Sequence, residues 1–295
     1  MIETPSRISV QLSPQIRVHA LRSGHVRIKP PHRAYRGPSA LRFPAILLDR
    51  RWTEWLPVWT WLIEHPAGRF LVDTGENSNV HDPGYFGDDR VSRWVNRSIL
   101  QLDISLDEQI DAHLAALDLA ASQIDAVVLT HLHLDHTDGL RFVADRPVLL
   151  ARDGWERPYG AALTTLPAAM SRELIDYAPT SIGGLSAQDN PFAGGHAIAD
   201  GLCIVPTPGH MFGHQSVLLT VGETVYCFAG DASFTEAQLL GGEIAGICID
   251  PAAAMATYGR LRTLAARVPL VYLPSHDPEA AVRLRASQTM PASPL

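Results

Sequence analysis

The stretch Ile124–His136, IDAVVLTHLHLDH, constrains the fold of this chain most strongly. Its first part, Ile124–Leu129, is apolar except for Asp125, and a short run of this kind suits a strand buried on both faces. Its second part brings together the polar side chains His131, His133, Asp135 and His136. Because packing gives no reason for such a cluster directly after a buried strand, we interpret it as a metal site rather than a surface loop that carries histidines by chance.

The spacing of these side chains indicates which of them could bind the same metal ion. In an extended chain, residues i and i+2 point to the same side, so His131 and His133 can hold one ion together. Asp135 and His136 follow where the chain must turn toward Gly139, and they can face a second ion. Imidazole nitrogens and carboxylate oxygens suit zinc above all, and also iron, manganese or cobalt.

Further ligands are expected from three loops, each of which follows an apolar, strand-like segment. His210 lies in PTPGHMFGHQS, Asp231 in AGDAS and His276 in LPSHD. Side chains at strand ends are held by a rigid sheet, which suits a binding site. The complete set fits two adjacent divalent ions. One would be held by His131, His133 and His210, the other by Asp135, His136 and His276, and Asp231 would bridge them.

The order HLHLDH, GH, GDAS and SHD resembles the signature of the metallo-β-lactamase superfamily, from about Leu56 to Asp277. Within it, three stretches resemble the N-acyl homoserine lactonases, which are quorum-quenching enzymes: Leu56–Gly75, Thr207–Ser216 and Asp231–Ser233. The resemblance implies one αββα sandwich over residues 16–288, with two mixed β-sheets inside and helices on the outer faces. We expect residues 1–15 to form a mobile arm and residues 289–295 a tail.

The resemblance also implies roles for individual residues. Two metal ions can bind one water between them and lower its pKa toward ~7, which supplies a hydroxide that can open a lactone ring. Asp135 and Asp231 would then be catalytic together with this hydroxide, and Asp135 would carry the proton. Asp73 and His214 would support the ligands without binding the ions.

One position departs from the lactonase pattern. The lactonases carry a tyrosine three residues after the bridging aspartate, and its phenol contacts the lactone carbonyl. This chain has Phe234 there, and a phenyl ring cannot donate a hydrogen bond. Phe234, Trp52 and Trp55 are candidates for the substrate pocket, although core packing is an equal alternative for the two tryptophans.

Other residues receive simpler interpretations. Trp59 and Trp61 alternate on one face of a strand and are expected in the core. His32 has no ligand-like spacing and is expected to be structural or solvent-facing. His113 lies off the apolar stripe of a helix predicted over Ser105–Leu117 and is expected to be exposed.

Composition limits the partners. The net charge is −7, with 24 basic and 31 acidic residues, which disfavours nucleic acid and an anionic membrane surface. The three cysteines form no CxxC pair, and no signal peptide is evident, so a cytoplasmic protein is expected. The expected partner is a small-molecule lactone, and the sequence leaves open whether the chain forms a homodimer.

Several alternatives use the same ligand set. Another lactone, an ester, or a thioester as in the glyoxalase II type would suit the same metals. Phosphodiester hydrolysis is disfavoured because no basic patch is visible. An iron redox protein of this fold is also conceivable, although no flavodoxin-like second domain is present. A non-catalytic binding module is least favoured, because the chain keeps all seven candidate ligands.

Overall fold

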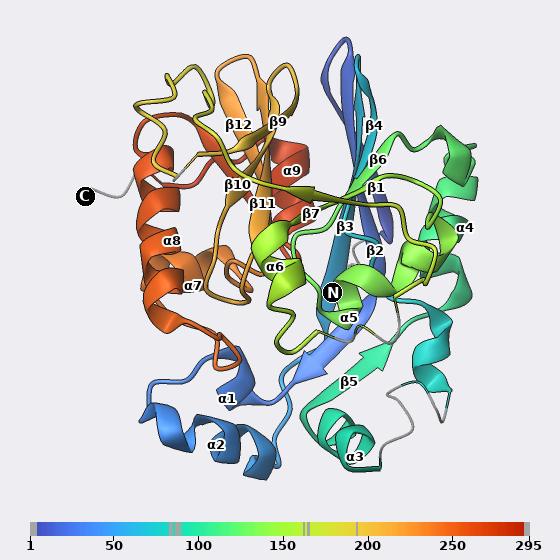
Figure 1. Cartoon of the computed structure of the whole chain (residues 1–295), viewed down its shortest axis with the longest axis vertical. Coiled ribbons are helices and arrows are strands. Elements are labelled where there is room, and N and C mark those ends of the chain that lie inside the picture. The colour runs from blue at the N-terminus through green and yellow to red at the C-terminus, as the bar shows by residue number, and fades with distance from the viewer. Residues whose placement is uncertain are drawn as a thin grey trace.

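The computed structural model describes residues 5–82, 85, 90–161, 163, 166–192 and 194–291, without the side chains of residues 39 and 91–93. Two mixed β-sheets form its centre (Figure 1). The first is eight-stranded, with the order β1-β2-β3-β4-β6-β7-β8 and with β5 paired to β2. Its strands are β1 (Arg7–Ser13), β2 (Ile16–Ile28), β3 (Leu56–His65), β4 (Gly68–Val72), β5 (Leu100–Asp103), β6 (Ala126–Val128), β7 (Val148–Ala151) and β8 (Arg172–Ile175).

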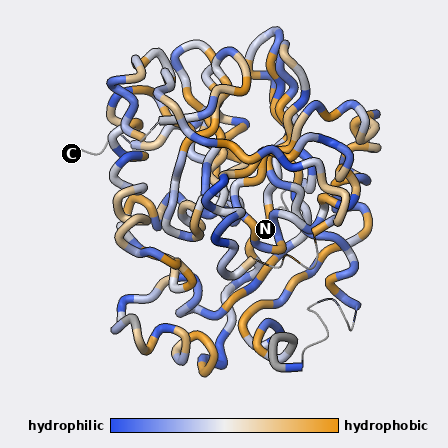
Figure 2. The backbone as a smooth tube through the Cα atoms, viewed as in Figure 1, coloured by the Kyte–Doolittle hydropathy of each residue, from blue (hydrophilic) through white to orange (hydrophobic). Residues whose placement is uncertain are grey.

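The second sheet is five-stranded, with the order β13-β12-β11-β10-β9. Its strands are β9 (His196–Ala199), β10 (Leu202–Pro206), β11 (Gln215–Val221), β12 (Thr224–Gly230) and β13 (Leu270–Pro274). Apolar side chains of both sheets meet in one core, which includes Trp59, Trp61, Phe228 and Val271. The prediction that both tryptophans are buried is confirmed, since each is 1% exposed. Figure 2 shows hydrophobic residues concentrated along these strands.

Helices cover the outer faces, as predicted for an αββα sandwich. Ile110 and Leu114 of α4 pack on the eight-stranded sheet, and Tyr258 and Leu261 of α8 pack on the five-stranded sheet. The α-helices are α1 (Pro30–Arg33), α2 (Arg42–Leu48), α3 (Arg90–Ile99), α4 (Ile110–Ala115), α5 (Leu134–Thr137), α6 (Arg152–Glu156), α7 (Glu236–Gly241), α8 (Pro251–Ala265) and α9 (Ala280–Ala286). Short 3-10 helices are Ser39–Leu41, Ser78–His81, Leu106–Glu108, Ala121–Gln123 and Asp138–Phe142.

The two chain ends differ from the expectation of an arm and a tail. Arg7–Ser13 forms β1, which pairs with β2 in antiparallel fashion, so the expected mobile arm is wrong for this stretch. The pairing gives the backbone groups of β1 partners, and Ile8 is buried in the core. At the other end, Met290 is 4% exposed and donates its backbone N–H to Leu270. Residues 1–4 and 292–295 lie outside the described residues.

The helix predicted over Ser105–Leu117 is divided into a 3-10 turn and α4. His113 is fully buried on α4, so the expectation that it is exposed is wrong. Its Nε2 lies 2.8 Å from the carbonyl oxygen of Arg22 on β2. The sequence could not reveal this partner, because the two residues are far apart along the chain. Within the described part of the chain, no helix is long and apolar enough to cross a membrane.

Candidate metal centre

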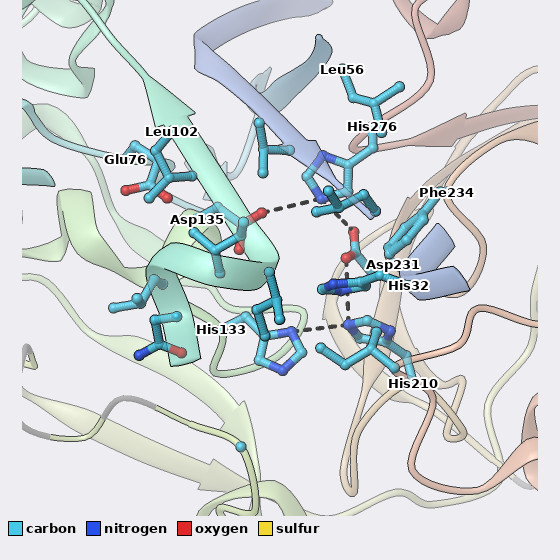
Figure 3. A pocket seen from close by; sticks show the side chains of 18 of the residues that line it. His32, Leu56, Glu76, Leu102, His133, Asp135, His210, Asp231, Phe234 and His276 are labelled. Atoms are coloured by element: carbon cyan, nitrogen blue, oxygen red, sulfur yellow. Dashed lines mark hydrogen bonds and ion pairs between the residues drawn. The ribbon is translucent and has the colours of Figure 1, made fainter. Parts of the chain in front are cut away.

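The predicted ligands lie together where several strands end (Figure 3). His131 and His133 follow β6, and the chain then turns into α5, which carries Asp135 and His136. The remaining three come from loops after β10, β12 and β13, and they are His210, Asp231 and His276. The structure therefore brings all seven predicted side chains to one edge of the sandwich. They form two groups, and within each group the ligand atoms lie within 4.8 Å of one another.

The first group consists of three imidazoles and one carboxylate. His133 Nδ1 lies 3.0 Å from Nε2 of His131 and 3.0 Å from Nε2 of His210. Oδ2 of Asp231 lies 3.4 Å from Nε2 of His210. Four ligand atoms around a tetrahedral zinc ion at about 2.0–2.1 Å would be ~3.3 Å apart. The spacing of this group therefore fits one small divalent ion.

The second group contains Asp135, His136 and His276, and it meets the other oxygen of Asp231. Oδ1 of Asp231 lies 3.4 Å from Nε2 of His136 and 3.3 Å from Nε2 of His276. Oδ2 of Asp135 lies 3.2 Å from Nε2 of His276. Asp231 thus directs one carboxylate oxygen at each group, which is the geometry expected of a bridging ligand.

Unsatisfied atoms indicate that these groups suit cations. His136 Nε2 and Asp231 Oδ1 are buried without a hydrogen-bond partner in the described chain, and such atoms are rare in folded proteins. Burial lowers the pKa of His131 and of His210 well below the usual value, so both rings are neutral and offer a lone pair. Burial opposes protonation of His276 too, but the carboxylates of Asp231 and Asp135 outweigh it and raise its pKa to about 10. The carboxylates thus attract positive charge.

Asp73 lies behind the second group. Its Oδ2 accepts hydrogen bonds from Nδ1 of His136 at 2.7 Å and from the Thr130 hydroxyl, and its Oδ1 accepts from the backbone N–H of Thr130. The Thr130 hydroxyl in turn lies 3.0 Å from Nδ1 of His131. Each contact leaves Nε2 of the ring free to face the ion, which is how supporting residues orient metal-binding histidines.

His214 lies behind Asp231 and belongs to neither group of ligand atoms. Its Nε2 accepts the backbone N–H of Asp231 at 3.1 Å, and its Nδ1 lies 2.9 Å from the Thr207 hydroxyl. Burial lowers the pKa of His214 to about 3, so its ring is neutral and can accept this bond. The chain can turn from β12 into Asp231 because the last residue of the strand is Gly230. Gly230 has φ +54°, and a Cβ there would lie 2.6 Å from the Thr130 hydroxyl oxygen.

A cavity of about 350 Å³ opens onto both groups. One part of its lining is apolar and comes from β2, β3, α3 and β5, with Val26, Ile28, Leu56, Ile99, Leu100 and Leu102. Another part comes from His133, Asp135, His210, Asp231 and His276. Gly160 and Ala161 contribute to the wall from the segment between α6 and β8, which the sequence left without a clear assignment.

The three candidates for the substrate pocket differ in whether they line the cavity. Phe234 lines the cavity, with its ring centroid 5.9 Å from that of His210 and 5.3 Å from that of His276. Trp52 and Trp55 do not line it, so that prediction is wrong. Instead Lys29 lies over the Trp52 ring and Arg27 over the Trp55 ring, and Trp55 borders a separate depression beside Leu100 and Leu102. Cation–π stacking therefore holds both indoles in place of core packing.

Two residues of the cavity were missed by the sequence analysis. His32 is 5% exposed and lines the cavity, so it is neither solvent-facing nor remote from the site. Glu76 is 1% exposed and lies on the Asp135 side (Figure 3). Burial, with the nearby charges of Asp135 and Asp138, raises the pKa of Glu76 well above its usual value. A possible signal for Glu76 was its place directly after Asp73-Thr74-Gly75, whereas His32 had none.

The fold, the set of candidate ligands and the cavity together define one class of protein. A family model described as the metallo-beta-lactamase superfamily matches residues 53–276. The chain therefore belongs to the metallo-β-lactamase superfamily, as the motifs implied.

Several proteins of this class that resemble the chain are N-acyl homoserine lactonases. The N-acyl homoserine lactonase AiiA of Bacillus thuringiensis subsp. kurstaki is 26% identical over 226 residues, covering 76% of this chain and 82% of that protein. The structure of an N-acyl homoserine lactone hydrolase with N-hexanoyl-L-homoserine at its catalytic metal centre superposes with a TM-score of 0.71 at 19% identity, covering 93% of this chain and 97% of the other. The dizinc quorum-quenching lactonase AidC gives a TM-score of 0.59 at 14% identity, covering 92% and 91%. These two structures support the fold.

Proposed function

We propose that this chain is a dinuclear-metal hydrolase that opens a lactone ring, with N-acyl homoserine lactones as its substrates. The observation that carries the proposal is the placement of Asp231. Its two oxygens lie 3.4 Å from His210 Nε2 and 3.3 Å from His276 Nε2, one toward each group of ligands, beside a cavity. The lactonases among the relatives support the choice of substrate.

The residues that would hold the ions are the seven of the two groups. His131, His133 and His210 would hold one ion, Asp135, His136 and His276 the other, and Asp231 both. Zinc is the proposed metal because imidazole and carboxylate ligands suit it, and one structural neighbour is described as dizinc. When bound, two such ions supply an activated water and Lewis acidity toward a carbonyl group.

The chain's own residues would position the reactants and move the proton. Water adds to the lactone carbonyl carbon, the bond from this carbon to the ring oxygen breaks, and the ring oxygen leaves as an alkoxide that needs a proton. Asp135 borders the cavity with its side chain 16% exposed, whereas Asp231 is nearly enclosed at 4%. Asp135 is therefore the better placed of the two carboxylates to pass a proton to the departing oxygen.

The apolar wall of the cavity suits an acyl chain. Val26, Ile28, Leu56 and Leu102 offer no polar side-chain atom, so an alkyl chain that lies against them loses no hydrogen bonds. Removal of such a chain from water is favourable in proportion to its buried area. The lactone head would then lie on the ligand side, with its carbonyl near the two groups. A homodimer and a cytoplasmic location remain predictions.

A second candidate is supported by Phe234. Because this ring cannot donate a hydrogen bond to a carbonyl oxygen, the substrate could instead be another lactone, an ester or a thioester of the glyoxalase II type. The test is a pH-drop assay on purified zinc-loaded protein with acyl homoserine lactones of several chain lengths, a thioester and a phosphodiester. The proposal expects ring opening of the homoserine lactones to be fastest. Faster hydrolysis of the thioester, with no lactone opened, would contradict it.

A further inference from the structure

The Phe234 side chain leaves part of the cavity wall without a hydrogen-bond donor. Its ring lies beside both groups of ligands, 5.9 Å from the His210 ring and 5.3 Å from the His276 ring between centroids. It is 3% exposed and has no polar atom. A carbonyl group bound in front of it would receive no hydrogen bond from this position. The neighbours of Phe234 therefore decide whether such a bond is available.

His32 is a polar neighbour of Phe234 in the cavity that belongs to neither group of ligands. It lies on α1, remote in sequence from every predicted ligand, and its ring centroid is 6.4 Å from that of Phe234. Both residues line the same cavity, and Figure 3 shows them on the same side of it as His210. Glu76, another polar residue of the wall, lies beyond Asp135 on the opposite side. Asn96 on α3 also lines the cavity, but the ring contact with Phe234 is that of His32.

The backbone of His32 is fixed from two sides. Its N–H donates to the carbonyl of Lys29 at 2.9 Å, and its carbonyl accepts from the N–H of Gly246 at 2.8 Å. The adjacent carbonyl of Arg33 accepts from the side-chain amide of Gln238. The close approach at Gly246 requires glycine, because a Cβ there would lie 1.8 Å from the Pro31 carbonyl oxygen. The backbone that carries the His32 ring is therefore already in place before a reaction begins.

One nitrogen of the His32 ring makes no hydrogen bond to the part of the chain that the structure describes. This nitrogen is Nδ1, and it is buried. Burial lowers the pKa of His32 to about 4, so at neutral pH the ring carries one N–H donor and one lone pair. A buried polar atom without a partner is unfavourable. If this residue served packing alone, an apolar side chain would fill the same space without that penalty.

We propose that His32 donates a hydrogen bond to the carbonyl oxygen of the substrate and so supplies the donor that Phe234 lacks. This inference rests on the proposed function, because it requires a substrate with a carbonyl at the ligand groups. The oxygen gains negative charge as water adds to the carbonyl carbon. The bond from His32 therefore strengthens on the way to the transition state, and its loss should lower kcat more than it raises KM.

Three substitutions separate hydrogen bonding from shape. His32→Leu removes both ring nitrogens, His32→Asn places an amide nitrogen close to the position of Nδ1, and His32→Gln places one close to that of Nε2. We expect His32→Leu to lower kcat by ~10²-fold, with KM changed less than threefold and the zinc content unchanged. At least one of the two amide variants should recover tenfold or more of that loss, and the one that does identifies the donating nitrogen.

A substitution at Phe234 tests the relation between the two rings. Phe234→Tyr adds a hydroxyl beside the same space. If His32 and a tyrosine at this position can serve the same carbonyl oxygen, Phe234→Tyr should raise kcat much more in the His32→Leu background than in the wild type. Equal gains in both backgrounds would mean that the two side chains act independently, and would contradict the shared target.

His19→Leu is the matched control, because His19 is also a buried histidine but lies on β2 with partners at Ser9 and Glu64. It should leave kcat unchanged in the fraction that folds. Three results would overturn the inference: His32→Leu within threefold of the wild-type kcat, loss of zinc from that variant, or amide variants no better than leucine. If the wild type opens no lactone and hydrolyses no ester or thioester, the proposed function itself fails, and this inference with it.

Discussion

Oδ2 of Asp73 lies 2.7 Å from Nδ1 of His136, and both side chains are almost completely buried. Asp73 has a left-handed backbone conformation, with φ +58°, which is uncommon outside glycine. The same carboxylate also accepts two hydrogen bonds from Thr130. This arrangement fixes the N–H of His136 on the side away from the cavity and turns its Nε2 toward Asp231.

Asp73→Asn should therefore weaken the second metal position without removing a ligand. The amide is a poorer acceptor for the His136 N–H, so the ring is held less firmly. We expect metal affinity or activity to fall by ~10–100-fold, measured by competition with a chelator and by kcat. Asp111→Asn, at an exposed position on α4, is the control. Unchanged affinity in Asp73→Asn would mean that this contact does not orient His136.

Asp231→Ala should have a larger effect than the loss of a ligand from one group. Both oxygens of Asp231 would be lost, one facing each group, so we expect both ions to bind poorly and activity to fall with them. His131→Ala removes a ligand from the first group alone and should leave the second group's residues in place. Metal analysis of the two variants measures the difference. Two ions retained in Asp231→Ala would show that this carboxylate is not a bridge.

His214→Ala should lower activity without abolishing either metal position. The substitution leaves the backbone N–H of Asp231 without its acceptor, and an unsatisfied buried donor costs about 1–3 kcal/mol. The free energy of unfolding should fall by about that amount, while zinc still binds with reduced affinity. Denaturant unfolding and metal titration measure the two effects. Complete loss of one ion from a folded variant would identify His214 as a ligand instead of a support.

Phe234→Tyr distinguishes between substrates. On acyl homoserine lactones we expect a higher kcat, about tenfold, which corresponds to about 1.4 kcal/mol of barrier. If Phe234 instead packs against an apolar part of another substrate, the added hydroxyl is buried without a partner and activity on that substrate falls. The measurement is kcat and KM on the lactone panel for both proteins. Lower activity on every acyl homoserine lactone would favour another lactone or an ester.

The ligand cluster could be predicted from the sequence because each ligand directly follows an apolar strand. HLHLDH places four of the side chains in one short stretch, and the strands before the other three, β10, β12 and β13, run in the same direction and therefore end at the same edge of their sheet. The start of α8 has a local signal too, because Asp250 suits an N-cap and Pro251 the first helical position, and the Asp250 side chain accepts the N–H of Ala253. These features depend on local chemistry, which neighbouring residues reveal.

The features that were missed depend on contacts between distant segments. His32 enters the cavity because α1 is held against the segment before α8 through Gly246, and nothing near His32 in the sequence indicates this. His113 was assigned to the surface because the stripe of its own helix did not include it, yet it reaches the Arg22 carbonyl on β2. Trp52 and Trp55 stack with cations from β2 and its end. Long-range packing decides such positions, and periodicity alone does not encode it.

The most direct test is the rate of ring opening of N-hexanoyl homoserine lactone as metal-stripped protein is titrated with zinc. If two ions held by His131, His133, Asp135, His136, His210, Asp231 and His276 open the ring, the stripped protein should be inactive. Activity should then rise with added zinc until it levels off at two ions per chain. Full activity in the metal-free protein, or no ring opening at two bound ions per chain, would contradict the account.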